Sequence, residues 1–566
     1  MRELIRVARG EKKADLVLKN AQIVNVLDGK IEQGDVAIYR SKIAGIGDYK
    51  GKLEVDIKGK YLVPGFIDGH LHIESTMLCP EEFSRAAILN GTTTVIADPH
   101  EIANVAGVEG IRYMIEAAKN GLISIFFVLP SCVPATHLET SGAILSARDL
   151  EPLMDEESIL GLAEMMNFPG VISEDPAVME KLELKFNLVD GHAPGLCGKE
   201  LCAYIAAGIR SDHECTQLEE AREKLKRGMF IMIREGSTAK NLKNLIPIVD
   251  EFTAPRCLLV SDDRHPEDLI EEGEINALLK MAIAQGLNPF RAFQLATINP
   301  ANYFGLRDRG AIAPGFLADI VILDDLNSVS INSVYKSGQL VVQGGEIIKD
   351  VKKIEPPMEV KDSVRFKEID FSYFTISARG RRCRVMGIIP NQIITKELIL
   401  PPKVENGDVV ADIENDIIKI AVIERHKDTG NKSLGLVQGF GIKSGALAST
   451  VAHDAHNIAV VGTNDHDMAM AVNAIINAKG GLAVARSGQI TCVPLPIAGL
   501  MSDKTLEEVY REVKELRRAV LELNPRVANP FMVLSFLSLA VIPELKLTDK
   551  GLVEVLAGRI VDLFTD

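Results

Sequence analysis

The 566-residue sequence has no Cys-x-x-Cys pair, no apolar run long enough to span a bilayer and no dense basic patch. Its eight cysteines are scattered along a chain that is large enough to fold without disulfides, which favours a reduced, cytoplasmic protein. The missing apolar run predicts no membrane partner, and Met1–Arg6 lacks the long apolar core of a signal peptide. The 63 basic and 78 acidic residues give a net charge of −15, which argues against a nucleic-acid partner.

The chain is too long for one hydrophobic core, so we expect two or three domains. Short strands with glycine-containing turns fill residues 14–60, and strands with similar turns return at 308–355. We predict that segments 1–64 and 308–355 together form a small β-sandwich domain, because neither segment is long enough to fold alone. We predict a linker at 352–362, which contains Glu355-Pro356-Pro357, and a C-terminal α/β domain at 356–566.

Residues 65–307 repeat a strand, loop and helix pattern. Eight candidate strands alternate with helical stretches such as Pro80–Leu89, 108–119 and 215–226. This alternation predicts an α/β fold with a closed parallel (β/α)8 barrel of the TIM type. The candidate strands are 62–67, 93–97, 123–129, 159–163, 186–189, 208–210, 228–233 and 257–260.

Two histidines stand at the end of the first of these strands, in Gly69-His70-Leu71-His72. On a strand, residues i and i+2 point to the same face, so His70 and His72 can converge on one point. Two converging imidazoles make half of a metal site. Taken alone, the pair is equally compatible with a chance arrangement in a loop.

The other strand ends strengthen the metal interpretation. Glu164, His192, His213 and Asp262 follow the fourth, fifth, sixth and eighth strands, and the carboxyl ends of barrel strands form the active-site face. Each of these residues alone is more often a helix cap or a solvated loop residue, but so many together are not explained in that way. The predicted ligands are His70, His72, Glu164, His192, His213 and Asp262.

This nitrogen and oxygen set suits Zn²⁺, Mn²⁺ or Fe²⁺. Six ligands suffice for a binuclear centre if one carboxylate bridges the ions, and Glu164 is placed to do so. Water bound at such a centre is acidified to hydroxide at neutral pH, and Asp262 is positioned to take its proton. The residues therefore predict metal-assisted hydrolysis, without specifying the bond that is cut.

Two further groups of polar residues lie outside the predicted ligand set. Asp98 and His100 follow the second strand, and we predict a role in substrate binding or in orienting the ligands. His453, Asp454, His456 and His466 lie within fourteen residues, in a loop and at a helix start. One hypothesis places His453 and His456 over the barrel mouth, in contact with substrate. The alternative is that they only order the C-terminal domain.

These motifs resemble the amidohydrolase superfamily and, within it, the adenine deaminases, over essentially the whole chain. The stretches that carry the resemblance are Phe66–Ser75, Ala97–Ile102, Pro130–Thr136, Leu162–Asn167, Asp190–Gly195, Ser211–Glu214, Ile233–Ser237, Ser261–Arg264 and His453–Asn457. The resemblance implies hydrolysis of adenine to hypoxanthine and ammonia, with Mn²⁺ or Fe²⁺ as the expected metals and a homo-oligomer as the expected state.

One departure narrows the resemblance. Many members of the superfamily bridge two metals with a carbamylated lysine on the fourth strand, but Gly161–Asn167 contains Glu164 and no lysine. This difference points away from dihydropyrimidinase-like and dihydroorotase-like enzymes. The chain also lacks the Pro-Cys-x-x-Cys signature of the zinc-dependent nucleobase deaminases.

Deamination requires proton transfer both to the purine ring and to the departing amine. We predict Asp262 and Glu235 as the two catalytic carboxylates, although Glu235 is also suited to pairing with Arg234 or a loop lysine. Another cyclic-amide or N-acyl hydrolase remains an alternative on the same scaffold. A non-catalytic assembly protein would be expected to lack ligands, and all six are present.

Overall fold

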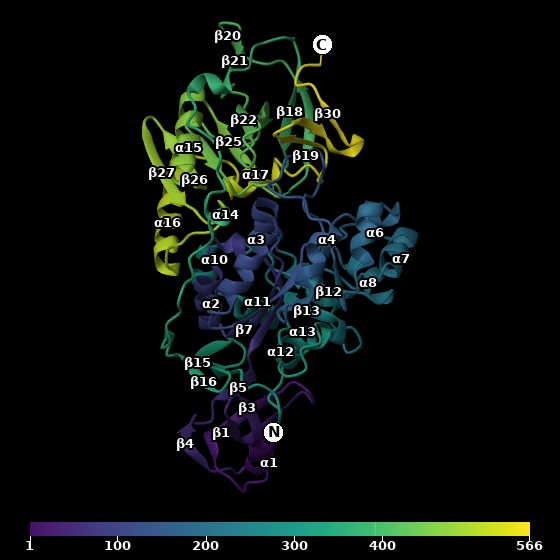
Figure 1. Ribbon diagram of the computed structural model, residues 1–566, viewed down its shortest axis with the longest axis vertical. Helices are drawn as coiled ribbons and strands as arrows, with labels where there is room; N and C mark the ends of the chain where they lie inside the picture. Colours follow the sequence, from purple (N-terminus) through teal and green to yellow (C-terminus); the bar gives the residue numbers. More distant parts are fainter. Residues whose placement is uncertain (391, 566) are drawn as a thin grey trace.

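The computed structural model describes residues 1–390 and 392–565; Asn391 and Asp566 of the predicted C-terminal domain lie outside the described residues. Three parts follow one another along its longest axis (Figure 1). An N-terminal β-sheet lies at one end, the barrel occupies the middle, and the C-terminal part lies at the other end. No helix among the described residues is both long and apolar enough to cross a membrane.

The N-terminal sheet combines strands from before and after the barrel. Its order is β17-β16-β15-β14-β5-β1-β2-β3, with β4 paired to β1. The two chain segments meet where β14 runs antiparallel to β5, with Ile320 opposite Pro64. The strands are β1 Ala14–Asn25, β2 Lys30–Tyr39, β3 Lys42–Gly47, β4 Gly51–Asp56, β5 Tyr61–Pro64, β14 Ile320–Asp325, β15 Ser330–Lys336, β16 Gln339–Gln343 and β17 Glu346–Ile347.

The strand expected at 62–67 is two strands in the structure. β5 ends at Pro64 in the N-terminal sheet, and β6 (Phe66–Leu71) opens the barrel. Gly65 makes the break: a Cβ on this residue would lie 2.2 Å from Oγ1 of Thr93, so only glycine allows the chain to pass there. The apolar run alone gave no sign of this change of sheet.

The barrel wall has eight parallel strands in two ladders, β10-β9-β8-β7-β6 and β11-β12-β13. A parallel bridge between Leu71 and Asp262 joins β6 to β13, and the Arg210 N–H donates to the Val189 carbonyl between β10 and β11. This curled sheet is an α/β barrel of the TIM type. The strands after β6 are β7 Thr92–Ala97, β8 Ser124–Leu129, β9 Ile159–Met165, β10 Val189–Gly191, β11 Ser211–Asp212, β12 Phe230–Arg234 and β13 Cys257–Val260.

The sixth strand was predicted at 208–210 but lies at 211–212. Gly208 has a φ of +103° and ends the turn after the preceding helix, since its N–H donates to the Ile205 carbonyl. The fifth strand also begins later than predicted, at Val189. Both predicted strands began too early because an apolar pattern does not separate a strand from the turn that leads into it.

Helices cover the barrel. The predicted helix Pro80–Leu89 is α2, and the one predicted at 108–119 begins earlier, at His100, across a non-helical Gly107. The longer barrel helices are α2, α3 His100–Ala118, α6 Pro176–Leu182, α7 Gly198–Ala206, α8 Leu218–Lys226, α10 Pro266–Glu271, α11 Ile275–Ala284, α12 Pro289–Leu295 and α13 Ile298–Tyr303.

The C-terminal part contains an eight-stranded sheet in the order β19-β18-β23-β22-β25-β24-β26-β27. Asn464 caps helix α15 (Asp465–Asn477) by accepting a hydrogen bond from the Asp467 N–H. The predicted linker at 352–362 includes a short helix, α14 Met358–Lys361. The strands of this sheet are β18 Cys383–Ile388, β19 Thr395–Leu400, β22 Ile417–Ile423, β23 Lys432–Gln438, β24 Ala446–Ser449, β25 Ile458–Gly462, β26 Gly481–Arg486 and β27 Gln489–Pro494. Two smaller sheets are formed by β20 Val404–Glu405 with β21 Asp408–Val409, and by β28 Leu545–Thr548, β29 Gly551–Glu554 and β30 Arg559–Val561. The longer helices are α15, α16 Leu506–Glu522 and α17 Pro530–Phe536.

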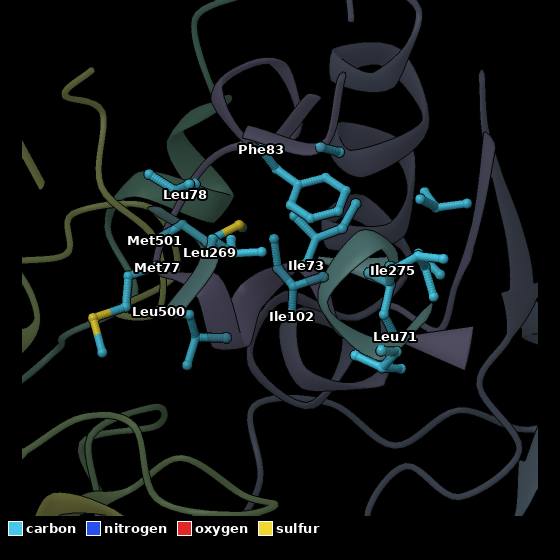
Figure 2. Packing of buried hydrophobic residues seen from close by; sticks show 14 of the residues in the cluster. Leu71, Ile73, Met77, Leu78, Phe83, Ile102, Leu269, Ile275, Leu500 and Met501 are labelled. Carbon is cyan, nitrogen blue, oxygen red and sulfur yellow. The ribbon is translucent and has the colours of Figure 1, made fainter. Parts of the chain in front are cut away.

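The C-terminal part packs directly on the barrel. Leu500 and Met501 belong to the same buried cluster as Leu71 of β6 and Ile102 of α3 (Figure 2). The Ser502 N–H also donates to the Met77 carbonyl at 2.8 Å. The segments after β6 and β7 therefore pack against the barrel on one side and against the C-terminal part on the other.

Candidate metal centre

His70 and His72 are fixed by contacts of β6 with its neighbours. The Asp68 carboxylate accepts hydrogen bonds from the His70 N–H at 3.1 Å and from the Ser261 N–H at 3.1 Å, which ties β6 to the end of β13. His72 lies one residue beyond the strand, with Nδ1 3.1 Å from the carbonyl oxygen of Asp98. Its Nε2 lies near the carboxylates of Glu164 and Asp262, which Nε2 of His70 also faces.

Glu164, at the end of β9, lies between two pairs of histidines. Its Oε1 is 3.9 Å from Nε2 of His70 and 3.4 Å from Nε2 of His72. Its Oε2 is 2.6 Å from Nδ1 of His192 and 3.2 Å from Nε2 of His213. Burial opposes ionisation of this carboxyl, but His213 and His192 outweigh it and hold the pKa of Glu164 well below its ordinary value. One ionised carboxylate therefore faces both pairs.

Asp262 follows β13 with a φ of +58°, in the left-handed region. Its Oδ1 is 3.2 Å from Nε2 of His72 and 3.7 Å from Nε2 of His70. Its Oδ2 accepts a hydrogen bond from Nη1 of Arg234 at 2.6 Å. Burial raises the pKa of Asp262, but the Arg234 guanidinium and the histidines more than offset this and hold it well below its ordinary value.

The chemistry of these side chains fits a divalent metal. Nε2 of His70 is buried and has no hydrogen-bond partner among the described residues. Burial holds the pKa of His70 well below its ordinary value, so the imidazole is neutral and its lone pair is available. Three overlapping groups bring their ligand atoms within 4.8 Å of one another: His70, Glu164 and His213; His70, His72 and Asp262; His72, Asp98, His100 and Glu164.

Asp98 and His100 lie beside this centre. Oδ2 of Asp98 is 3.0 Å from Nδ1 of His100, and the same nitrogen is 3.5 Å from Oε1 of Glu164. Nε2 of His100 is 3.4 Å from Oε1 of Glu101. The chain thus brings both residues to the site, where His100 links Glu164 to Glu101.

His453 and His456 come from the loop after β24 and contact Glu101. Nδ1 of His453 is 2.8 Å from Oε1 of Glu101, and His456 contacts the other carboxylate oxygen through Nε2. His466 lies elsewhere, exposed on α15. The loop that one of the two hypotheses places over the barrel mouth therefore reaches the residues next to the candidate ligands.

Glu101, His453 and His456 have the composition of a further metal site, but the hydrogen bonds argue against one. The Ala452 N–H donates to Nδ1 of His456 at 3.2 Å, and burial lowers the pKa of His456 to about 4. A neutral imidazole that accepts at Nδ1 carries its proton on Nε2. His456 therefore donates to Glu101, and this group is a hydrogen-bonded clamp.

The chain matches two family models. Residues 61–358 match the Amidohydrolase family, and residues 392–559 match the Adenine deaminase C-terminal domain. Adenine deaminase 2 of Carboxydothermus hydrogenoformans is 52% identical over 558 residues, which cover 98% of each chain. Adenine deaminase of Desulfatibacillum aliphaticivorans is 51% identical over 566 residues, covering 99% of each chain.

The chain belongs to the adenine deaminase family. The family resemblance seen in the strand-end motifs is thereby confirmed, and the match to the amidohydrolase model is consistent with the barrel. A solved structure described as the crystal structure of an adenine deaminase matches at 18% identity with a TM-score of 0.46, and the match covers 58% of this chain and 99% of that one.

In this deaminase-family chain, two charged residues of the site were not selected from the sequence. Glu214 follows His213, and its Oε1 is 3.5 Å from the imidazole of that residue. Arg234 pairs with Glu214 and with Asp262. Both residues belong to the strand-end motifs. Their ion pairs could not be predicted from the sequence, because the partners follow different strands and meet only in the folded barrel.

Glu235 lies at the same rim with a different environment. Its carboxylate accepts a hydrogen bond from the Leu242 N–H at 2.9 Å. Burial raises its pKa above the ordinary value. Arg234 forms its ion pairs with Glu214 and Asp262 instead. Glu235 is thus a carboxyl of raised pKa, and its catalytic role stays a prediction.

Proposed function

We propose that this protein hydrolyses adenine to hypoxanthine and ammonia. The observation that carries the proposal is the convergence of four imidazoles on Glu164 and Asp262 at the carboxyl ends of the barrel strands. The full-length similarity to proteins named adenine deaminase supplies the substrate. A barrel of this type has its active site on that face.

We propose His70, His72, Glu164, His192, His213 and Asp262 as ligands of a binuclear centre, with Glu164 as the bridging group. Mn²⁺ or Fe²⁺ is the preferred metal, and Zn²⁺ suits the same ligands. When bound, such a centre supplies a water molecule whose pKa lies near neutrality. The support for this set is the position of Glu164, whose two oxygens face separate pairs of histidines.

In this proposal Asp262 accepts the proton of the attacking water. Its low pKa keeps it ionised at neutral pH. Because Arg234 binds Oδ2, Oδ1 is the oxygen that faces His70 and His72. This oxygen would contact both the metal and its water, which places it to take the proton of that water. Glu235, whose pKa is raised, is suited to give a proton to the purine ring or to the departing amine.

In this proposal, the loop after β24 that carries His453 and His456 covers the active site. His453 and His456 hold Glu101, and Glu101 contacts His100 beside Glu164. A cover of this kind excludes bulk water from the site and fixes polar groups around the purine. Beneath this cover, Asp98 and His100 of the barrel face the substrate or orient the metal ligands.

We also propose three domains: a β-sandwich from 1–64 and 308–355, the barrel at 65–307, and an α/β domain at 356–566. The sheet shared by β5 and β14 supports the first of these. The proposed setting is a cytoplasmic homo-oligomer that binds neither nucleic acid nor membrane. The net charge of −15 and the scattered cysteines support that setting.

The test measures ammonia release from purines, pyrimidines, cyclic amides and N-acylated amino acids by metal-loaded enzyme. We expect adenine to be the best substrate. Hydrolysis of a cyclic or N-acyl amide without adenine turnover would replace the proposal by the alternative amide hydrolase.

Metal analysis of His70→Ala and His72→Ala accompanies this assay. Both variants should lose metal and turnover together, whereas His466→Ala, which removes an exposed histidine of α15, should keep both. Full metal content in His72→Ala would contradict the ligand assignment.

A further inference from the structure

The barrel wall is interrupted between β10 and β11. These strands belong to different ladders and are only three and two residues long. Elsewhere in a parallel sheet, evenly spaced backbone hydrogen bonds fix the ends of neighbouring strands relative to each other. Here the interruption lies directly before His192 and His213. A backbone hydrogen bond from the Arg210 N–H to the Val189 carbonyl still joins the two strands, and buried side chains connect them beyond that point.

We infer that two buried side chains outside the site, Lys224 of α8 and Tyr204 of α7, are positioning residues for the ligands at the ends of β9, β10 and β11. The inference rests on the ligand set of the proposed function. Neither residue contacts the reacting atoms in this assignment. Each holds the backbone directly beside a ligand.

Lys224 joins the ends of β10 and β11. Its Nζ is fully buried and donates to the carbonyl of Ala193 at 2.7 Å and to Oδ2 of Asp212 at 3.1 Å. Oδ1 of Asp212 accepts a hydrogen bond from the Ala193 N–H at 2.8 Å. Ala193 directly follows His192, and Asp212 directly precedes His213. The N–H of Ala193 is therefore bound to Asp212, next to His213, and its carbonyl is bound to Lys224, which also holds Asp212.

Glu220, one turn earlier on α8, extends this connection. Its Oε1 accepts hydrogen bonds from Nζ of Lys224 at 2.7 Å and from the Gly195 N–H at 2.8 Å. A buried ammonium is costly unless it is paired and hydrogen-bonded, and Lys224 meets that requirement with two carboxylates and a carbonyl. The arrangement fixes the loop after His192 to one helix.

Tyr204 joins the ends of β9 and β10. Its hydroxyl accepts a hydrogen bond from the His192 N–H at 2.9 Å and donates to the carbonyl of Met165 at 2.8 Å. Met165 directly follows Glu164. The side chain is fully buried, so water does not compete for these bonds. Tyr204 and Lys224 together connect three consecutive ligand positions across the interrupted wall.

The test compares Tyr204→Phe and Lys224→Met with matched controls. Tyr335→Phe removes the hydroxyl of a buried tyrosine in the N-terminal sheet, and Lys226→Met changes an exposed lysine of the same helix. The apparent Kd for Mn²⁺ is measured by competition with a chelator, and Tm is measured on the metal-free protein. Loss of groups that orient metal ligands typically weakens affinity by about 10-fold to 100-fold.

We expect Tyr204→Phe and Lys224→Met to weaken Mn²⁺ binding by about 10-fold or more, with both controls unchanged. Unchanged Mn²⁺ affinity in Tyr204→Phe and Lys224→Met would overturn the inference. His192→Ala serves as the reference for the ligand set. If that variant binds Mn²⁺ normally, the proposed ligands are wrong, and this outcome is distinct from failure of the positioning role.

Lys224→Met also leaves Asp212 without its cation, so a second variant separates folding from positioning. In Lys224→Met/Asp212→Asn the amide oxygen still accepts from the Ala193 N–H, while the unpaired buried charge at that position is gone. We expect Tm to recover toward the wild-type value while Mn²⁺ affinity stays weak, because the Ala193 carbonyl has lost its donor. Recovery of both would show a purely structural role for Lys224. If neither Lys224 variant folds, Tyr204→Phe decides the inference alone.

Discussion

Arg234 donates a hydrogen bond to Oδ2 of Asp262 at 2.6 Å, inside a cluster of candidate metal ligands. The same guanidinium binds Glu214, with Nη2 3.0 Å from Oε2. A fixed positive charge within a cation site is unexpected, because it repels the metal. Its effect on Asp262 explains its presence: it keeps this carboxylate ionised and leaves one oxygen directed toward His72.

We predict that Arg234→Met moves the acid limb of the kcat/KM–pH profile to higher pH. Arg234 lowers the pKa of Asp262, so its removal raises that pKa, and the carboxylate takes up a proton at a higher pH than before. On the acid side of the shifted limb, kcat/KM should fall by about 10-fold for each pH unit, so the loss is largest at acidic pH. Arg222→Met, at an exposed position of α8, is the control. An unshifted acid limb in Arg234→Met would show that Asp262 is not the titrating group.

Glu164→Gln tests the proposed bridging role of this carboxylate. A neutral amide cannot hold two cations together, so metal content should fall from about two ions per chain to about one. Elemental analysis after dialysis against a weak chelator measures this. Two ions per chain at normal affinity in the variant would exclude the bridging role.

Asp262→Asn and Glu235→Gln test the two proposed proton carriers. Each should lose at least about 100-fold in kcat, because a positioned acid or base contributes about 10²-fold to 10⁴-fold. Circular dichroism and metal analysis check that both variants fold and bind metal. Near-normal turnover in Glu235→Gln would mean that this carboxyl only binds the Leu242 N–H.

His453→Ala tests the contact between the C-terminal loop and the barrel. The change removes a partner of Glu101 whose imidazole lies 2.8 Å away. If the loop is the cover of the site, KM for adenine rises or kcat falls by about 10-fold while Tm changes little. Kinetics and Tm are measured on the same preparation, beside His466→Ala. A fall in Tm with normal kinetics would make the contact purely structural.

Lys546 gives a prediction about pH and stability. It is fully buried, and Nζ donates to the carbonyls of Ile393 at 2.8 Å and Phe536 at 2.9 Å. Burial lowers its pKa from 10.5 to about 7. Between these values the folded protein binds fewer protons than the unfolded chain, so stability must rise with pH across that window.

We therefore expect the free energy of unfolding of the wild type, minus that of Lys546→Met, to increase as the pH rises from about 7 to about 10. The increase should be on the order of 4 kcal/mol. Urea unfolding at a series of pH values measures the difference. Lys550→Met, at an exposed position nearby, is the control, and its free energy of unfolding should change with pH in the same way as that of the wild type. A constant difference between wild type and Lys546→Met would mean that Lys546 keeps an ordinary pKa.

The sequence predicted the barrel and the meeting of the candidate ligands for one physical reason. Parallel strands in a closed barrel all end on the same face, so a polar residue after each apolar run must lie near the others. His70, Glu164 and Asp262 were identified in this way, without any knowledge of distances. The strand limits at 62–67 and 208–210 were wrong because Gly65 separates two strands within one apolar run, and because Gly208 belongs to the turn that precedes β11.

The sequence by itself determined the residue types, their spacing along each strand and the alternation that closes the barrel. Tertiary structure alone decided which charges pair, because Arg234 with Asp262 and Glu101 with His453 join residues that are far apart in the chain. It also decided that Lys224 and Tyr204 lie beside the candidate ligands, since a buried polar side chain selects its partner by proximity in the folded state. Local sequence patterns do not indicate which residues far apart in the chain will be neighbours in the fold.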